Sequence, residues 1–156
     1  MNDAASRPQA EVECLRPAVS HFNFCYKPPT GDDGCTPGYW RNHADRWFGV
    51  TPADDFDATF GVDLFDPNIT LGAAIKLQGG GVSAFARHAT AALLNALGGV
   101  PNADATTVDY PKSAEEVIQM VRDAVANGTI EATKDEFAEM NEAGCPLSGT
   151  SANPVP

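Results

Sequence analysis

The stretch Gly34-Cys35-Thr36-Pro37-Gly38-Tyr39-Trp40-Arg41-Asn42-His43 decides the fold of this chain. The Thr36 hydroxyl can cap a helix, and Pro37 suits the first helical position, where no amide donor is needed. Apolar and aromatic residues then recur with helical period on one face. That face carries Trp40, His43, Ala44, Trp47 and Phe48. Because both tryptophans of the chain lie on it, we expect a helix at 36–48 that is central to the core or forms one wall of a site.

Four further segments show helical periodicity. They are 71–78, ended by three glycines, the long segment 82–97, a segment opened by the Ser113 and Glu116 capping box, and 130–143. Segment 82–97 is apolar on nearly every side, which is typical of a buried helix. Residues 49–70 contain prolines and acidic residues and read as loop. The expected core residues are Trp40, Trp47, Phe85, Leu93, Val117, Val121 and Phe137.

The chain divides into an arm, one domain and a tail. Prolines and a glycine-rich turn prevent long helices in residues 1–34. Residues 19–26 alternate so that Phe22, Phe24 and Tyr26 share one face, which predicts one or two short strands. Residues 35–147 form the helical domain, and 148–156 are a small polar tail. We therefore predict a mainly α fold: a single compact five-helix domain with a non-helical N-terminal arm.

Charge and hydropathy exclude several kinds of partner. The 156 residues include 10 basic and 21 acidic residues, for a net charge of −11. Nucleic-acid binding normally requires a basic surface, and anionic lipid attracts basic segments. No apolar run approaches the roughly 20 residues of a membrane span. We expect no nucleic-acid partner and no membrane insertion, and the acidic balance favours solubility or the binding of cations.

Four cysteines indicate an oxidising compartment. No two of them form a C-x-x-C pair, so a zinc ribbon is not expected, and an even number at wide spacing suits two disulfides. Three connectivities are possible. We favour Cys35–Cys145, which would tie the start of the domain to its end, together with Cys14–Cys25. We expect an extracellular or cell-surface location, although the N-terminus shows no charged-then-apolar leader that would indicate the export route.

An acidic stretch is the best metal candidate. Calcium takes six to eight oxygen ligands from carboxylates, amides and carbonyls on a turning loop. The candidate ligands are Asp54, Asp55, Asp57, Asp63 and Asp66. Their spacing departs from an EF-hand because Gly61 comes one place late and no terminal bidentate glutamate follows. We expect calcium as the cofactor, held in an irregular site.

The candidate catalytic residues are two histidines. His43 lies one helical turn from Tyr39 and Trp40 but lacks an evident orienting carboxylate, and His88 lies beside Arg87 on the buried segment. Both histidines read more readily as structural than as catalytic residues. Together with a carboxylate they could bind a metal, which gives the alternative hypothesis of a secreted, metal-dependent, hydrolase-like enzyme.

Two polar residues of the opening stretch suggest a structural role. The Arg41 guanidinium can stack on aromatic rings and pair with a carboxylate, and Asn42 can satisfy backbone groups of a loop. Read this way, Tyr39, Trp40, Arg41, Asn42 and His43 form a structural motif that fixes a loop to the helix. Since no nucleophile and base stand out as a pair elsewhere, we expect that the protein is not an enzyme.

The opening stretch resembles the C-T-P-G-Y-W-K/R-N-H signature of a family of predicted secreted and surface proteins, mostly bacterial. The resemblance runs from Cys35 to Leu147. Its later blocks are Phe60-Gly61, Leu71-Gly72, Gly79-Gly80-Gly81, Ala86-Arg87-His88-Ala89, Ala91-Ala92-Leu93-Leu94-Asn95-Ala96, Tyr110-Pro111, Val117-Ile118 and the closing Asn141 to Leu147. It implies a place in extracellular matrix material, as calcium-dependent filaments, and it supplies no catalytic chemistry.

These observations combine into one functional hypothesis. We expect an extracellular structural protein that self-associates into a matrix or filament. The unpaired N–H and C=O groups of an exposed strand edge can pair with another chain. The arm would therefore pair with a neighbouring copy and bury Phe22, Phe24 and Tyr26. Calcium would neutralise the acidic surface that opposes such assembly.

Overall fold

The computed structural model describes residues 31–147 and 154–156, and it is mainly helical. Within these ranges there are six α-helices rather than the expected five, and no named strand. They are α1 (Pro37–Arg41), α2 (Phe56–Phe60), α3 (Leu71–Ile75), α4 (Val82–Leu97), α5 (Ala114–Asn127) and α6 (Ile130–Asn141), with a short 3₁₀ helix, η3 (Ala44–Arg46), after α1. The strands expected in the arm, including Phe22, Phe24 and Tyr26, lie outside the described residues.

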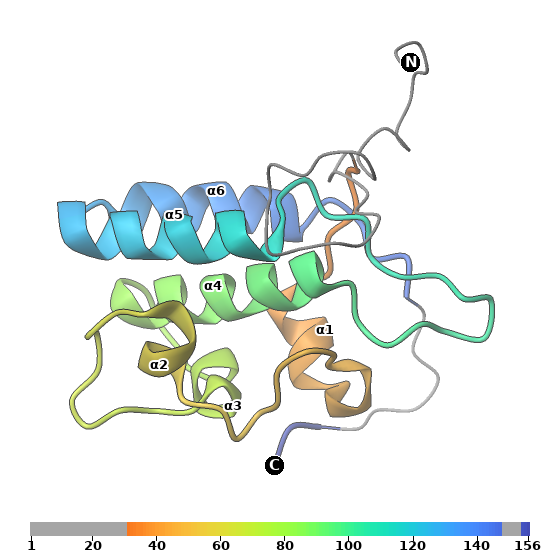
Figure 1. Cartoon of the computed structure of the whole chain (residues 1–156), viewed down its shortest axis with the longest axis horizontal. Helices are drawn as coiled ribbons and strands as arrows, with labels where there is room; N and C mark the ends of the chain where they lie inside the picture. The colour runs from red at the N-terminus through yellow and green to blue at the C-terminus, as the bar shows by residue number, and fades with distance from the viewer. Residues whose placement is uncertain (1–30, 148–153) are drawn as a thin grey trace, which may run out of the picture.

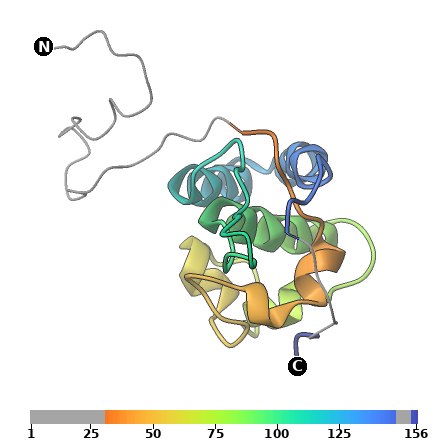
Figure 2. The ribbon, with the colours of Figure 1, turned by 90° about the vertical axis from the view of Figure 1, so that its right-hand side faces the viewer.

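The helices form layers around α4. In Figure 1, α5 and α6 run side by side along one face of α4, and α1, α2 and α3 cover its other face. The end-on view of Figure 2 shows the same three levels. Accordingly α4 contacts α1, α3, α5 and α6.

Helix α4 fills the centre because its sequence is apolar all round. It begins after the three glycines and ends at Gly98, whose φ of 91° lies in the left-handed region that glycine tolerates. Its alanines let the neighbouring helices approach closely. The core residues expected from the sequence are all buried, which confirms them: Trp40, Trp47, Phe85, Leu93, Val117, Val121 and Phe137.

The first helix is shorter than expected. It ends at Arg41, and η3 follows after His43, whose backbone is non-helical with φ −138° and ψ 65°. A continuous helix would bond the Trp40 carbonyl to the fourth amide along. Here that carbonyl accepts the Trp47 indole N–H at 3.0 Å, with the indole buried. Both tryptophans are buried on either side of this bend.

Helix α2 was not expected, since residues 49–70 read as loop. Asp55 caps its start by accepting the Ala58 amide, and Gly61 ends it in the left-handed conformation with φ 69°. Phe56 and Phe60 are fully buried, with ring centroids 4.7 Å apart. Burial of these two rings holds a five-residue helix that would be marginal alone.

A disulfide closes the domain. Cys35 is bonded to Cys145, 110 residues away, which confirms the favoured pairing. Beside it, Gly34 and Gly144 exchange backbone hydrogen bonds of 2.9 and 3.1 Å. A Cβ at Gly34 would lie 1.9 Å from the Met140 carbonyl oxygen, so this approach requires glycine. The second expected pair, Cys14–Cys25, lies outside the described residues.

The last three residues lie against the layer formed by α1, α2 and α3. The Val155 amide donates to the Arg41 carbonyl at 2.8 Å, and Lys76 Nζ donates to the Pro156 carbonyl at 2.6 Å. Val155 is buried. No helix in the described part of the chain is both long and apolar enough to cross a membrane.

Candidate functional site

A buried amide, Asn95, organises the centre of the molecule. It lies on α4 and is fully buried. Its Oδ1 accepts the Cys35 amide at 2.8 Å and the Trp40 indole N–H at 3.0 Å. Its Nδ2 donates to the Cys35 carbonyl and to Asn141 Oδ1, each at 2.9 Å. Because backbone and indole N–H groups only donate, they fix which side of the Asn95 amide carries oxygen.

The orientation of the Asn95 amide fixes that of the Asn141 amide, which in turn determines which ring nitrogen of His88 accepts a hydrogen bond. Asn141 Oδ1 accepts both the Asn95 amide and the Tyr110 hydroxyl, the latter at 2.8 Å. Asn141 Nδ2 therefore faces His88, where it lies 3.1 Å from the carbonyl oxygen and 3.3 Å from Nδ1. Since Nδ2 is a donor, Nδ1 of His88 accepts, and the neutral ring carries its proton on Nε2.

The surroundings favour this neutral imidazole. Burial lowers the pKa of His88 below 6.5, and the Arg87 guanidinium lowers it further, while Glu142 acts in the opposite direction. Burial also raises the pKa of Tyr110, so its hydroxyl stays protonated and donates to Asn141. At neutral pH the network is thus uncharged, and each donor meets an acceptor.

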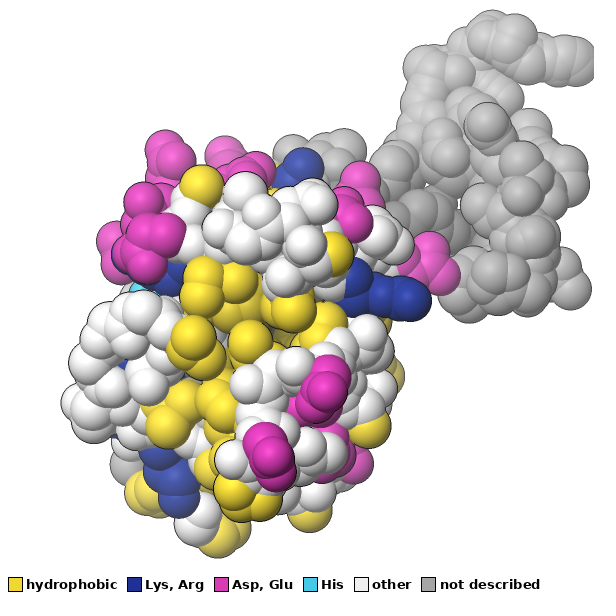
Figure 3. All heavy atoms as spheres, turned by 90° about the vertical axis from the view of Figure 1, so that its left-hand side faces the viewer, with side chains coloured by type: hydrophobic (Ala, Val, Ile, Leu, Met, Phe, Trp, Pro, Cys, Tyr) yellow, Lys and Arg dark blue, Asp and Glu magenta, His cyan; other side chains and the backbone are white. Residues whose placement is uncertain are grey.

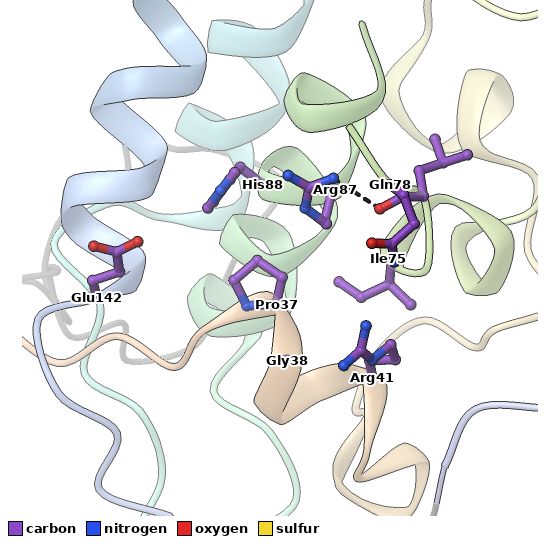
Figure 4. A pocket seen from close by; sticks show the side chains of 9 residues that line it. Pro37, Gly38, Arg41, Ile75, Gln78, Arg87, His88 and Glu142 are labelled. Carbon is purple, nitrogen blue, oxygen red and sulfur yellow. Dashed lines mark hydrogen bonds between the residues drawn. The ribbon is translucent and has the colours of Figure 1, made fainter. Parts of the chain in front are cut away.

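A pocket of about 330 Å³ opens beside this network. Arg41 reaches it from α1, Arg87 and His88 from α4, and Glu142 from the end of α6 (Figure 4). Its apolar lining is Pro37, Ile75 and Leu77, and Gly38 and Gln78 complete it. The elements meet here because the disulfide and the Asn95–Asn141 bond hold α1, α4 and α6 together.

Neither arginine of the pocket pairs with a carboxylate of residues 31–147 or 154–156. Arg87 Nη1 donates to the Leu77 carbonyl at 2.8 Å and to the Gly79 carbonyl at 3.2 Å, which points the guanidinium along the pocket wall. The Arg41 guanidinium forms no hydrogen bond or ion pair with the described residues. The ion pairs there involve Lys134 instead. Two unneutralised guanidinium groups at a hollow in an acidic chain can bind an anion.

The structure divides the sequence-predicted motif between two roles. Trp40 joins the buried network and Arg41 lines the pocket, whereas Asn42 ends α1 as its C-cap. The His43 ring stacks on Tyr39 with centroids 4.3 Å apart, and it does not line the pocket that His88 lines. Asn42 and His43 therefore shape the bend after α1.

Three of the five aspartates predicted to bind calcium accept backbone amides of their own loop or helix. Asp54 accepts the Thr51 amide and Asp55 caps α2. Asp57 is buried, and one of its oxygens accepts the Leu64 and Phe65 amides, each at 3.0 Å. Two further members, Asp63 and Asp66, are exposed.

No group of three or more histidine, cysteine, aspartate or glutamate side chains that could hold a metal ion occurs in residues 31–147 and 154–156. Neither the aspartates nor His43 and His88 form such a group there. The calcium site and the metal-dependent enzyme both stay predictions.

The sequence reading missed the roles of Asn95, Asn141 and Tyr110. A signal was present for Asn95, since one asparagine interrupts an otherwise apolar helix and a buried polar group needs partners. All three residues also lie in the blocks that carry the family resemblance. No family, no curated protein and no solved structure was found to match this chain.

Proposed function

We propose that this protein is an extracellular structural protein whose copies associate, with acidic helices of one copy meeting the cationic pocket of the next. The observation that carries the proposal is charge separation on one small domain. The guanidinium groups of Arg41 and Arg87, which pair with no carboxylate among the described residues, line the pocket, while the α5–α6 layer is strongly acidic. The Cys35–Cys145 disulfide supports the extracellular location, because such bonds persist in oxidising compartments.

The acidic surface is densest on α6. Its exposed carboxylates are Glu131, Asp135, Glu136 and Glu139, with Glu142 following directly. Lys134 pairs with Glu131 at 3.1 Å and with Asp135 at 2.6 Å, so it offsets only part of this charge. Figure 3 shows acidic side chains along the upper layer and also below the band of apolar side chains that crosses this face.

The proposal places this contact between copies. A helix rises about 1.5 Å per residue, so Glu131, at the far end of α6, lies roughly 16 Å from Glu142 at the pocket rim and does not reach the pocket of its own chain. A contact between two different surfaces of the same protein is heterologous. Such contacts build rings or open filaments, which suits a matrix component.

Two further parts of the proposal come from the sequence. Phe22, Phe24 and Tyr26 of the arm would add apolar burial to the contact. Calcium would reduce the repulsion between copies that each carry a net charge of −11. Both parts concern how strongly copies associate, and the pocket contact can be tested without them.

Charge reversal on α6 tests the proposal. We expect the double variant Glu136→Lys, Glu139→Lys to assemble less than the wild type in sedimentation velocity and negative-stain microscopy at low salt. The matched control is Asp45→Lys, Asp104→Lys, which changes the net charge equally at exposed positions outside α5 and α6. Equal loss in both doubles would mean that only net charge matters. Unchanged assembly in the α6 double would contradict the proposal.

A further inference from the structure

We infer that the pocket bounded by Arg41, Arg87, His88 and Glu142 binds a carboxylate group. The inference rests on the proposed function in one respect: it names the group that the acidic helix of a second copy would insert. A free small carboxylate offers the same chemistry, so the site can be tested apart from assembly.

The donors of the pocket match an oxyanion. A guanidinium presents parallel N–H groups in a planar fork that fits the two oxygens of a carboxylate. Arg87 is held by two backbone carbonyls, so little side-chain freedom remains for a ligand to remove. Arg41 comes from a different helix and lines the same pocket (Figure 4).

His88 adds a neutral donor. The chain of hydrogen bonds from Trp40 through Asn95 and Asn141 assigns the acceptor role to Nδ1, which leaves the proton on Nε2, at the edge of the ring turned away from Asn141. A neutral donor favours an anion without adding charge. The protein thus specifies the tautomer through buried groups that no ligand touches.

Glu142 selects among anions. It is the one carboxylate among the described residues that line the pocket, and its charge opposes a second negative charge there. A singly charged carboxylate neutralises one guanidinium and is tolerated beside Glu142. A doubly charged sulfate or phosphate meets more repulsion. The apolar lining, which includes Pro37, Ile75 and Leu77, suits the methylene stem of a glutamate side chain.

Binding of defined probes tests the inference with the full-length protein. The probes are sodium acetate, sodium sulfate and a synthetic peptide of residues 130–142, followed by calorimetry and by the NMR signals of the arginine Nε–H and His88 ring groups. We expect acetate and the peptide to compete, and sulfate to bind more weakly than acetate. In Glu142→Gln the preference for acetate over sulfate should shrink. Sulfate binding more tightly than acetate in the wild type would overturn the assignment.

Variants locate the site. Arg41→Gln should weaken peptide binding about tenfold or more, because the variant loses a charge-assisted hydrogen bond to the carboxylate. Arg122→Gln, at an exposed arginine on α5 outside the pocket, is the matched control and should change it less than about twofold. Equal affinities in the Arg41 and Arg122 variants would place binding elsewhere and overturn the inference. The circular dichroism spectrum of each variant shows whether it is folded.

The assembly assay separates this inference from the proposed function. If Arg41→Gln loses acetate binding and assembly together, both stand. Loss of acetate binding with unchanged assembly supports the carboxylate site and overturns the second copy as its partner. Loss of assembly with retained acetate binding overturns the assignment of the carboxylate to Arg41.

Discussion

The side-chain amides of Asn95 and Asn141 hydrogen-bond to each other at 2.9 Å, and this bond joins α4 to α6 in the buried centre of the domain. Both residues are fully buried. Around them, Cys35, Trp40 and Tyr110 supply the remaining partners. Groups from four separate stretches of the chain are therefore linked by hydrogen bonds, and a substitution at one should weaken the bonds of the others.

Asn95→Ala should lower the free energy of unfolding by about 3–5 kcal/mol, because each buried donor or acceptor left unsatisfied costs about 1–3 kcal/mol. The Cys35 amide and the Trp40 indole N–H would lose their acceptor. Urea denaturation measures the loss. Asn102→Ala is the control: its side chain also accepts two backbone amides, those of Asp104 and Thr106, but in a loop near solvent. A similar loss in both variants would contradict the importance assigned to burial.

Stability should fall as the pH drops through 6.5, because the folded protein holds His88 neutral while the unfolded chain protonates it. The pKa of His88 is lowered in the folded state, so unfolding takes up a proton in this range. The decline should begin near the unfolded value of 6.5 and level off below the folded pKa.

His88→Asn tests the assignment, since its amide oxygen can accept from Asn141 without titrating. This variant should lose the slope between pH 6.5 and the folded pKa in a series of denaturation curves. His43→Asn, which alters a ring stacked on Tyr39 outside the network, should keep the slope. An unchanged slope in the His88 variant would assign it to other groups.

Gly99→Ala should destabilise the fold more than Gly79→Ala. Both glycines have positive φ, 75° and 90°, so alanine is strained by about 1–2 kcal/mol at either position. A Cβ at Gly99 would lie 2.9 Å from the Trp40 ring and 3.0 Å from Leu147, whereas one at Gly79 meets nothing within 4 Å. Overpacking adds about 1–3 kcal/mol at Gly99 alone. The melting temperatures of the two variants measure the difference. Equal melting temperatures would argue against close packing of Gly99 on Trp40.

Deletion of residues 1–30 should leave a folded domain, because the core and the Cys35–Cys145 disulfide described above lie in the remaining chain. Far-ultraviolet circular dichroism should keep its helical shape. If Phe22, Phe24 and Tyr26 strengthen association, the truncated protein should assemble less and respond less to calcium in sedimentation velocity. Assembly and a calcium response equal to those of the full chain would rule out the arm as a contact.

The sequence predicted elements whose signals are local. The bounds of α4 agree with the expected 82–97, because apolar residues fill that segment and glycines flank it. The capping box of Ser113 and Glu116 is present and marks the start of α5. The Cys35–Cys145 pairing followed from the position of the two cysteines at the ends of the domain.

Features that depend on contacts across the chain could not be predicted in this way. At the break after α1 the Trp40 carbonyl accepts the Trp47 indole N–H and the His43 amide, although the apolar residues keep their helical period through it. The pocket brings Arg41, Arg87 and Glu142 together from distant stretches without any characteristic spacing. In each case the signal lies in the packing and not in the neighbouring residues.

The disulfide also determines the path that mechanical force takes. Tension applied to the arm before Cys35 and to the tail after Cys145 passes from one to the other through a single sulfur–sulfur bond. Once the contacts of Val155 with Arg41 and of Pro156 with Lys76 have broken, residues 36–144 between the two cysteines carry none of the load. Copies joined through their ends would form a strand whose strength is covalent within each unit, and it would yield first at the contacts between units.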